Sequence, residues 1–228
     1  MPNLSEAKAA VDNPASELPW MEPLRWDACD DPNLDLESLA SLPCWVGLEA
    51  DQRHGIMAAV LIFRGAGDHC AAIVATFPLL PNVAKMIAIL LEPLRVSEIV
   101  HDPWNCTMYL QGCSEITIHH APSGSALRAR ARDLLMTLVQ QQRFHHGRQA
   151  SLTTPLCNLF LNEHGVLRLP DCLRANISAA PVHALLLAFS SAYITEITAT
   201  PSKAPPAYMQ GSDTPQPEAS PSATSDAS

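Results

Sequence analysis

The stretch GIMAAVLIFRGAGDHCAAIVATF, from Gly55 to Phe77, decides the fold of this chain. It contains two apolar runs, Gly55 to Phe63 and Cys70 to Phe77, with the glycine-containing segment Arg64 to Asp68 between them. Short apolar runs joined by a turn are typical of paired strands that are buried on both faces. The apolar residues from Cys44 to Ala50 predict a strand beside this hairpin.

The rest of the core alternates between helical and extended patterns. The predicted helices run from Pro81 to Glu92, from Ser123 or Ser125 to Gly147, and from Pro181 to Tyr193. The other predicted hairpins pair Thr107–Leu110 with Glu115–His119 and Cys157–Leu161 with Val166–Leu169. This order predicts a single α+β domain with a largely antiparallel sheet of about seven strands in hairpins and three to four packed helices.

Charge divides the chain into three parts. Residues 1–42 hold nine acids against Lys8 and Arg25, whereas residues 43–199 hold eleven acids and eleven bases. We therefore expect an acidic, mostly disordered arm over 1–42 with a short helix at 31–42, and a core domain over 43–199. The remaining segment, 200–228, is rich in proline and serine and is expected to be a disordered tail.

Composition argues against several classes of protein. A net charge of −9 makes nucleic acid an unlikely partner, because proteins that bind nucleic acids usually present a basic surface. The most apolar segment, from Ile177 to Ile197, contains too many polar groups for a membrane span. Seven cysteines, with no apolar and positively charged start to the chain, predict a reducing compartment, cytoplasmic or nuclear.

The tail contains one short recognition motif. Pro205, Pro206 and Tyr208 lie in the sequence Pro-Pro-Ala-Tyr, which resembles the P-P-x-Y ligands of WW domains. This resemblance implies a WW-domain protein as partner. The alternative is a chance match, because the tail is rich in proline, alanine and serine.

Three arginines, Arg128, Arg130 and Arg132, lie in the opening turns of the long predicted helix. Cations at this end of a helix oppose its dipole, so local stability does not explain them. One hypothesis is that they bind an anion or the acidic segment from Asp27 to Glu37, in the same chain or in another copy. The alternative is solvated arginines paired with nearby acids such as Asp133.

No catalytic motif and no metal site is predicted, and no cofactor is expected. The doublets His119–His120 and His145–His146 do not chelate alone, because adjacent side chains point in different directions. Partners for them would have to come from residues such as His54, His69, His101 and Asp102. The segment from His101 to Trp104 is expected to be a turn closed by a buried tryptophan.

These observations favour a non-enzymatic adaptor or assembly protein, alone or in an oligomer, whose core binds a protein partner and whose tail presents the WW ligand. Two alternatives stay open. One is an enzyme with a histidine/aspartate or cysteine site assembled from distant loops. The other is a nucleic-acid-associated subunit that uses the arginine-bearing helix.

Overall fold

A computed structural model describes residues 19–66, 69–110, 118–120, 125–162 and 166–194 of the chain. Three nine-residue strands form its centre, β1 (Pro43–Asp51), β2 (Ile56–Arg64) and β3 (Cys70–Pro78). They pair antiparallel in sequence order. Seven of the nine residues of β2 are fully buried, as expected for a strand covered on both faces.

Three more strands extend this centre on both sides. They are β4 (Arg95–His101), β5 (Ile118–His120) and β6 (Phe144–His146). The strand β4 runs parallel to β1, β5 runs parallel to β4, and β6 runs parallel to the start of β3. The order across the sheet is therefore β5-β4-β1-β2-β3-β6. A separate short hairpin pairs β7 (Phe160–Leu161) with β8 (Leu167–Arg168).

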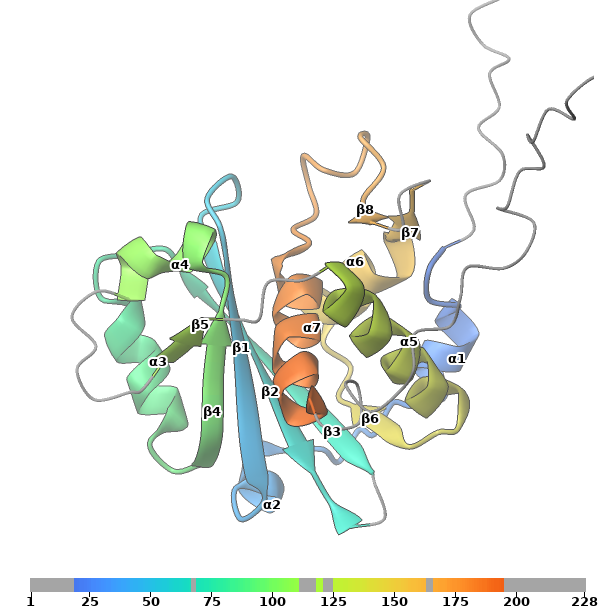
Figure 1. Ribbon diagram of the computed structural model, residues 1–228, viewed down its shortest axis with the longest axis horizontal. Coiled ribbons are helices and arrows are strands. Elements are labelled where there is room, and N and C mark those ends of the chain that lie inside the picture. The colour runs from blue at the N-terminus through green and yellow to red at the C-terminus, as the bar shows by residue number, and fades with distance from the viewer. Residues whose placement is uncertain (1–18, 67–68, 111–117, 121–124, 163–165, 195–228) are drawn as a thin grey trace, which may run out of the picture.

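Helices cover both faces of the sheet, which gives three layers (Figure 1). One face packs α3 (Val83–Leu91) and α4 (Pro103–Leu110) against residues such as Leu48 and Leu61. The other face packs α7 (Ala180–Ala192), with α5 (Ser125–Gln140), α6 (Ala150–Asn158) and α1 (Pro23–Asp27) outside it. A further one-turn helix, α2 (Leu36–Leu39), precedes β1. No helix in these described ranges has the length and apolar character that crossing a membrane requires.

The prediction of a single α+β domain is confirmed, but the sheet is mixed and several elements differ. The strand predicted from Thr107 to Leu110 is part of α4 instead. Pro103 at the start of this helix, and Asp102, which accepts a hydrogen bond from the Trp104 amide at 2.9 Å, explain why. The other predicted strand of that hairpin ran from Glu115 to His119; Ile118 and His119 belong to β5, which pairs with β4, whereas residues 111–117 lie outside the described residues.

The long predicted helix also ends earlier than Gly147. Gln142 has a φ of 54°, and this left-handed conformation terminates the helix before β6 begins. The helix α6 has no counterpart in the sequence analysis, because it contains Pro155 and no side chain caps its start.

The packed domain begins before Pro43. Met21 and Trp26 are fully buried in the core beside α5, and the Trp26 indole donates to Thr153 Oγ1 at 3.0 Å. Asp30 forms an ion pair with Arg148 at 2.5 Å, and the Asp31 amide donates to the His146 carbonyl at 2.8 Å. Part of the acidic segment is thus attached to the β6 edge of the sheet. Residues 1–18 of the arm and residues 195–228, which include the whole tail, are not described.

The central strand β1 touches α7 without an intervening side chain. A Cβ atom added at Gly47 would lie 2.0 Å from the Ala184 carbonyl oxygen and 2.7 Å from the Ala188 nitrogen. Only glycine permits this approach, since both neighbouring atoms belong to the helix backbone. The contact fixes the distance and the rotation of α7 over β1.

One glutamine side chain completes the outer edge of β3. The strand β6 pairs only with Cys70 to Ala72. Beyond them, Gln149 Oε1 accepts a hydrogen bond from the Val74 amide at 2.7 Å, and Gln149 Nε2 donates to the Val74 carbonyl at 3.1 Å. A side-chain amide therefore makes the two bonds that another strand would make.

The Gly47→Ala substitution should lower the free energy of unfolding by about 3 kcal/mol or more, because α7 must move away from β1. Urea unfolding followed by circular dichroism measures this change. Gly65→Ala is the matched control, since its nearest neighbour would lie 3.7 Å from the new Cβ, and it should cost less than about 1 kcal/mol. Equal losses in the two variants would contradict the tight contact.

Candidate active site

Three carboxylates lie where β1 and β4 end, on the face of the sheet that α7 covers. In β1, Val46 and Leu48 point to the opposite face, so Gly47, Glu49 and Asp51 point toward α7. In β4, Glu98 and Val100 meet Ser191 and Leu187 of α7. Asp102 follows in the same alternation. Because Leu48 pairs with His101, the next residues of these parallel strands, Glu49 and Asp102, come side by side.

Glu49 is the most buried of these acids, with 6% of its surface exposed. Its Oε1 accepts a hydrogen bond from Asn105 Nδ2 of α4 at 2.8 Å. The pKa of Glu49 is raised to about 7, chiefly by burial; the hydrogen bond from Asn105 and the charge of Arg128 lower it, whereas the charge of Asp102 raises it. The ionised form of Glu49 is therefore disfavoured unless a cation lies beside it.

Asp102 lies between α4 and α5. Its Oδ1 accepts from the Trp104 amide, and its Oδ2 accepts from Arg128 Nη2 at 3.4 Å. Arg128 is half-exposed, whereas Asp102 is 15% exposed. The guanidinium also acts electrostatically on Glu49 and on His183, so the positive charge of Arg128 influences all three groups of this site.

Asp51, at the end of β1, is held by a different set of donors. Its Oδ2 accepts from Ser178 Oγ at 2.6 Å and lies 2.7 Å from His54 Nδ1. Burial alone would raise the pKa of Asp51, but the hydrogen bonds from Ser178 and His54 outweigh it and lower the pKa. Asp51 is a charged carboxylate that joins the β1–β2 turn to the segment before α7.

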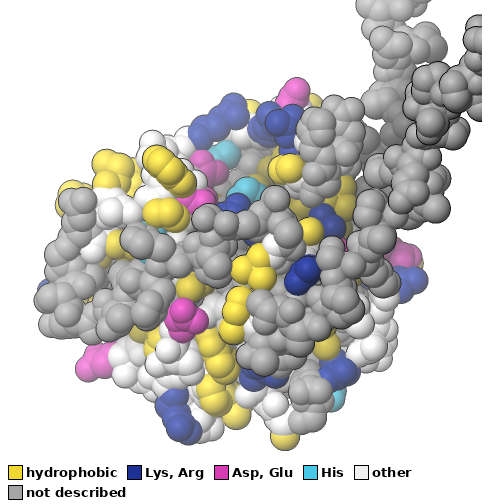
Figure 2. Space-filling model, viewed as in Figure 1, with side chains coloured by type: hydrophobic (Ala, Val, Ile, Leu, Met, Phe, Trp, Pro, Cys, Tyr) yellow, Lys and Arg dark blue, Asp and Glu magenta, His cyan; other side chains and the backbone are white. Residues whose placement is uncertain are grey.

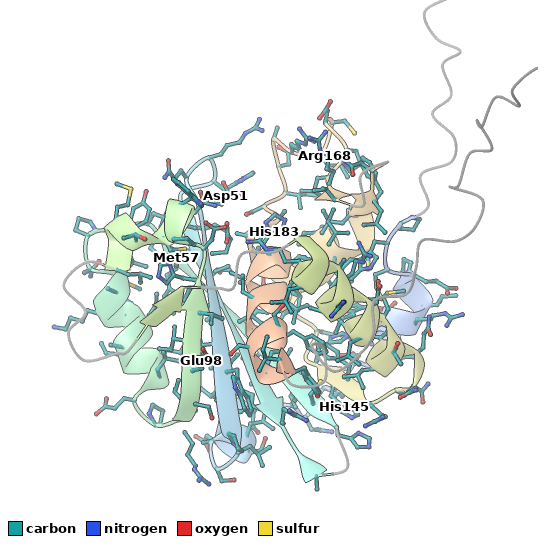
Figure 3. All side chains as sticks on the ribbon, viewed as in Figure 1. Asp51, Met57, Glu98, His145, Arg168 and His183 are labelled. Carbon is teal, nitrogen blue, oxygen red and sulfur yellow. The ribbon has the colours of Figure 1, made fainter. Side chains whose placement is uncertain are left out.

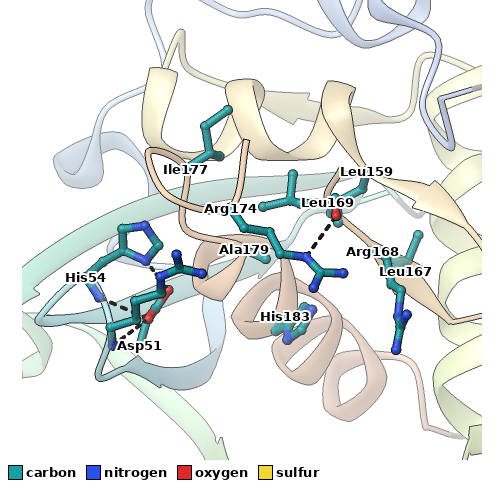
Figure 4. Close-up of a pocket in the computed structure, with 11 residues that line it drawn as sticks. Asp51, His54, Leu159, Leu167, Arg168, Leu169, Arg174, Ile177, Ala179 and His183 are labelled. Carbon is teal, nitrogen blue, oxygen red and sulfur yellow. Dashed lines mark hydrogen bonds and ion pairs between the residues drawn. The ribbon is translucent and has the colours of Figure 1, made fainter. Parts of the chain in front are cut away.

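A cavity of about 250 Å³ opens beside this group (Figure 4). His183, in the first turn of α7, lies across it from Asp51 (Figure 3). Burial and the positive charge of Arg128 lower the pKa of His183, so its imidazole is neutral at neutral pH. His183 thus borders both the cavity and the surroundings of Asp102.

The cavity wall carries more positive than negative groups. Three arginines line it, Arg53, Arg168 and Arg174, whereas Asp51 is the acid among its lining residues. Arg174 Nε donates to the Leu169 carbonyl at 3.0 Å, which holds that side chain over the cavity (Figure 4). Figure 2 shows acidic and histidine side chains in a hollow with Lys and Arg side chains at its border. Such a wall suits an anionic ligand.

Three buried cysteines of the described chain are poorly suited to act as nucleophiles. Burial raises the pKa values of Cys44, Cys70 and Cys106 to about 12, so these thiols stay protonated.

The His69 and His145 rings stack, with His69 Nδ1 and His145 Nε2 3.1 Å apart. Across the described part of the chain, no group of three or more His, Cys, Asp or Glu side chains could hold a metal ion.

Some of these residues are indicated by the sequence pattern, whereas others are not. Of the three arginines, Arg128 reaches Asp102, whereas Arg132 pairs with the neighbouring Asp133. Arg130 is partly buried and has an interaction of its own. The tail motif, Pro205, Pro206 and Tyr208, lies outside the described residues. Glu49 was missed, although a single acid within an otherwise apolar strand was the available signal.

The expected buried position of Trp104 is wrong. Its side chain is 91% exposed, because Cys106 and Leu110 form the inner face of α4. The turn predicted from His101 to Trp104 is instead the junction between β4 and α4, and it carries Asp102.

No family model and no curated protein matches this chain. Solved structures share its fold. The large terminase of bacteriophage HK97 aligns with a TM-score of 0.62 and 14% identity over 76% of this chain. The alignment spans only 43% of that terminase chain.

Two terminase nuclease structures are covered almost completely. The large terminase nuclease of the thermophilic phage G20c with bound magnesium aligns with a TM-score of 0.58 and 13% identity, over 78% of this chain and 98% of that one. The large terminase nuclease domain of bacteriophage SPP1 with bound Mn aligns with a TM-score of 0.51 and 15% identity, over 72% and 94%. The chain therefore has the fold of phage large terminase nuclease domains.

These likenesses overturn the prediction of a non-enzymatic adaptor, since the fold is one found in nucleases. The prediction that nucleic acid is an unlikely partner is wrong on the same ground, and a WW-domain partner has no support. Net charge misled the prediction, because most of the excess acids lie in the first 42 residues and the local charge of the cavity wall is positive.

The raised pKa of Glu49 predicts a stability that falls as pH rises. The folded chain keeps this proton up to about pH 7, whereas an ordinary glutamate loses it near 4.5. The unfolded state therefore binds fewer protons between these values, and the free energy of unfolding should fall by up to about 3 kcal/mol through this window. Glu49→Gln should remove this loss and be the more stable form at pH 8.

Urea unfolding with EDTA at a series of pH values measures this effect. Glu92→Gln is the matched control, because Glu92 is exposed at the end of α3 and its substitution should leave the pH dependence unchanged. The raised pKa of Glu49 is contradicted if the free energy of unfolding of Glu49→Gln falls with pH as steeply as that of the unsubstituted chain.

Proposed function

We propose that this chain is a nucleic-acid-cleaving enzyme whose active site is built around Glu49 and Asp102. The observation that carries the proposal is the meeting of these two carboxylates at the ends of parallel strands, opposite α7 and beside Arg128. The fold shared with phage terminase nuclease domains supports it. The proposal takes up the enzyme alternative left open by the sequence, but with a glutamate/aspartate pair at the ends of two strands in place of a histidine/aspartate or cysteine site on loops.

The carboxylate pair suits one divalent cation. Relatives of the same fold are described with bound magnesium or Mn. Oxygen ligands are those that Mg²⁺ prefers, and Mg²⁺ in proteins commonly takes one or two carboxylates, with water and substrate phosphates completing its coordination. Glu49 and Asp102 would supply these carboxylates. A bound cation would polarise a phosphoryl oxygen and make a bound water more acidic.

The remaining residues orient this pair and balance its charge. Asn105 fixes the Glu49 carboxylate, and the Trp104 amide fixes that of Asp102. Arg128 neutralises part of their charge when no other cation is present. His183, as a neutral imidazole, is the group of the site that can accept a proton from an attacking water.

The basic cavity wall gives the substrate a place to bind. Arg53, Arg168 and Arg174 line the cavity that His183 and Asp51 border. Guanidinium groups bind phosphate through paired, charge-assisted hydrogen bonds. A nucleic-acid strand crossing this wall would bring a phosphodiester toward Glu49 and Asp102.

Loss of either carboxylate should abolish cleavage. In an assay with labelled DNA and RNA and either Mg²⁺ or Mn²⁺, Glu49→Gln and Asp102→Asn should each lower the cleavage rate by about a hundredfold or more. Circular dichroism should show that both variants remain folded, because the two replacements preserve size and hydrogen-bonding capacity.

Glu92→Gln and Asp133→Asn are the matched controls for charge and shape. Glu92 is exposed at the end of α3, before the start of β4, and Asp133 is exposed on α5; both are away from the strand ends that carry Glu49 and Asp102, and both variants should cleave at the original rate. Equal activity in the site variants and the controls, or no cleavage of any nucleic acid by the unsubstituted chain with either ion, would refute the proposed function.

Arg128→Gln should strengthen cation binding. The guanidinium competes for the Glu49–Asp102 pair, so its removal should tighten Mn²⁺ binding by about fivefold, as measured by calorimetry. The matched control is Arg148→Gln, which breaks a similar ion pair with Asp30 at the other end of the sheet and should not change the affinity. Weaker Mn²⁺ binding in Arg128→Gln would contradict this role.

A further inference from the structure

We propose that Trp104 and Met108 form a surface that stacks an unpaired base of the substrate strand. This inference rests on the proposed function and names its substrate class as single-stranded or frayed nucleic acid. The two side chains lie one helical turn apart on the outside of α4, and 91% and 65% of their surfaces are exposed. We call them the α4 surface.

The core does not require these side chains. The inner face of α4 is formed by Cys106 and Leu110, and Cys106 Sγ donates to the Leu48 carbonyl. Two hydrogen bonds stabilise the first turn of α4. The Trp104 amide donates to Asp102 Oδ1, and Thr107 Oγ1 donates to the Pro103 carbonyl. The exposed indole and thioether therefore form an apolar face that is available to a ligand beside the carboxylate pair.

Trp104 differs from the other three tryptophans in its exposure and in its place next to residues of the proposed site. Trp20 and Trp26 are buried, and Trp45 is packed against the core. Trp104 comes two residues after Asp102 and one residue before Asn105, whose side chain holds Glu49. The α4 surface therefore adjoins the carboxylate pair, and Figure 2 shows hydrophobic side chains at the surface over the region of α4.

The geometry favours a nucleobase as the occupant. A strand whose phosphate lies at Glu49 and Asp102 has a base within reach of the next residues of α4. Aromatic side chains bind bases of any sequence by stacking on them. A base inside a duplex is already stacked on its neighbours, so the indole can stack only on an unpaired base. The thioether of Met108 extends the same apolar face.

Fluorescence can test this contact directly, because Trp104 is the one strongly exposed tryptophan of the four in the chain. Titration with a short single-stranded oligonucleotide in Ca²⁺ or EDTA, at fixed salt, should quench its emission. Trp104→Ala should lose this quenching and bind the single strand about tenfold more weakly, whereas its affinity for a blunt duplex of the same length should change less than about twofold. Trp104→Phe should keep most of the affinity.

The matched control is Ile89→Ala on α3, which removes another large exposed apolar side chain and should leave both affinities unchanged. Unaltered single-strand binding by Trp104→Ala would overturn the inference. A lower sedimentation mass of Trp104→Ala than of the unsubstituted protein, both without nucleic acid, would also overturn it, because it would assign the α4 surface to a contact between chains. If the unsubstituted chain binds neither single-stranded nor duplex nucleic acid, the proposed function is refuted, and the base-stacking inference that rests on it is refuted as well.

Discussion

The absence of a side chain at Gly47 is the constraint on which the site depends. Because the backbone of α7 lies directly on β1 at this residue, the first turn of the helix is fixed over the end of the strand, with His183 one residue before Ala184. The helix α5 packs on α7, and this arrangement brings Arg128 to Asp102. A backbone contact in the apolar centre thus aligns polar groups at the edge of the sheet.

The same packing makes the site electrostatically costly. Glu49 is excluded from water by the layers on both faces of the sheet, and it is near a second carboxylate. Only one neutral amide and one half-exposed guanidinium offset this charge. The chain retains a buried acid here at a cost in stability, and this is typical of residues kept for function.

The sequence predicts the parts of this molecule that depend on local pattern. The strands β1, β2 and β3 and the helices α3 and α7 follow from apolar runs and from proline at a helix start. Parallel pairing is different, because β4 joins β1 only after an intervening helix, and no local signal indicates which strand it will meet. The meeting of Glu49 and Asp102 follows from that pairing, so the carboxylate pair could not be predicted, although each acid could.

Local signals also competed with one another. The residues from Thr107 to Leu110 were predicted to be a strand because they precede a turn and the alternating segment from Glu115 to His119, yet Asp102 and Pro103 just before them cap a helix. The capping signal prevailed because it satisfies backbone donors that a strand at this place would leave unpaired. Trp104 was expected inside because tryptophan is usually buried, and the direction of its side chain depended on this choice between strand and helix.

The amide of Gln149 has a consequence for how copies of the chain meet. Past Ala72, the outer edge of β3 is long and apolar, and such an edge invites the strand of another molecule to add to it. Gln149 occupies both backbone groups of Val74 with a side chain that cannot extend into a strand. A single residue thus occupies the backbone groups of Val74, which works against the addition of another strand at this point of the edge.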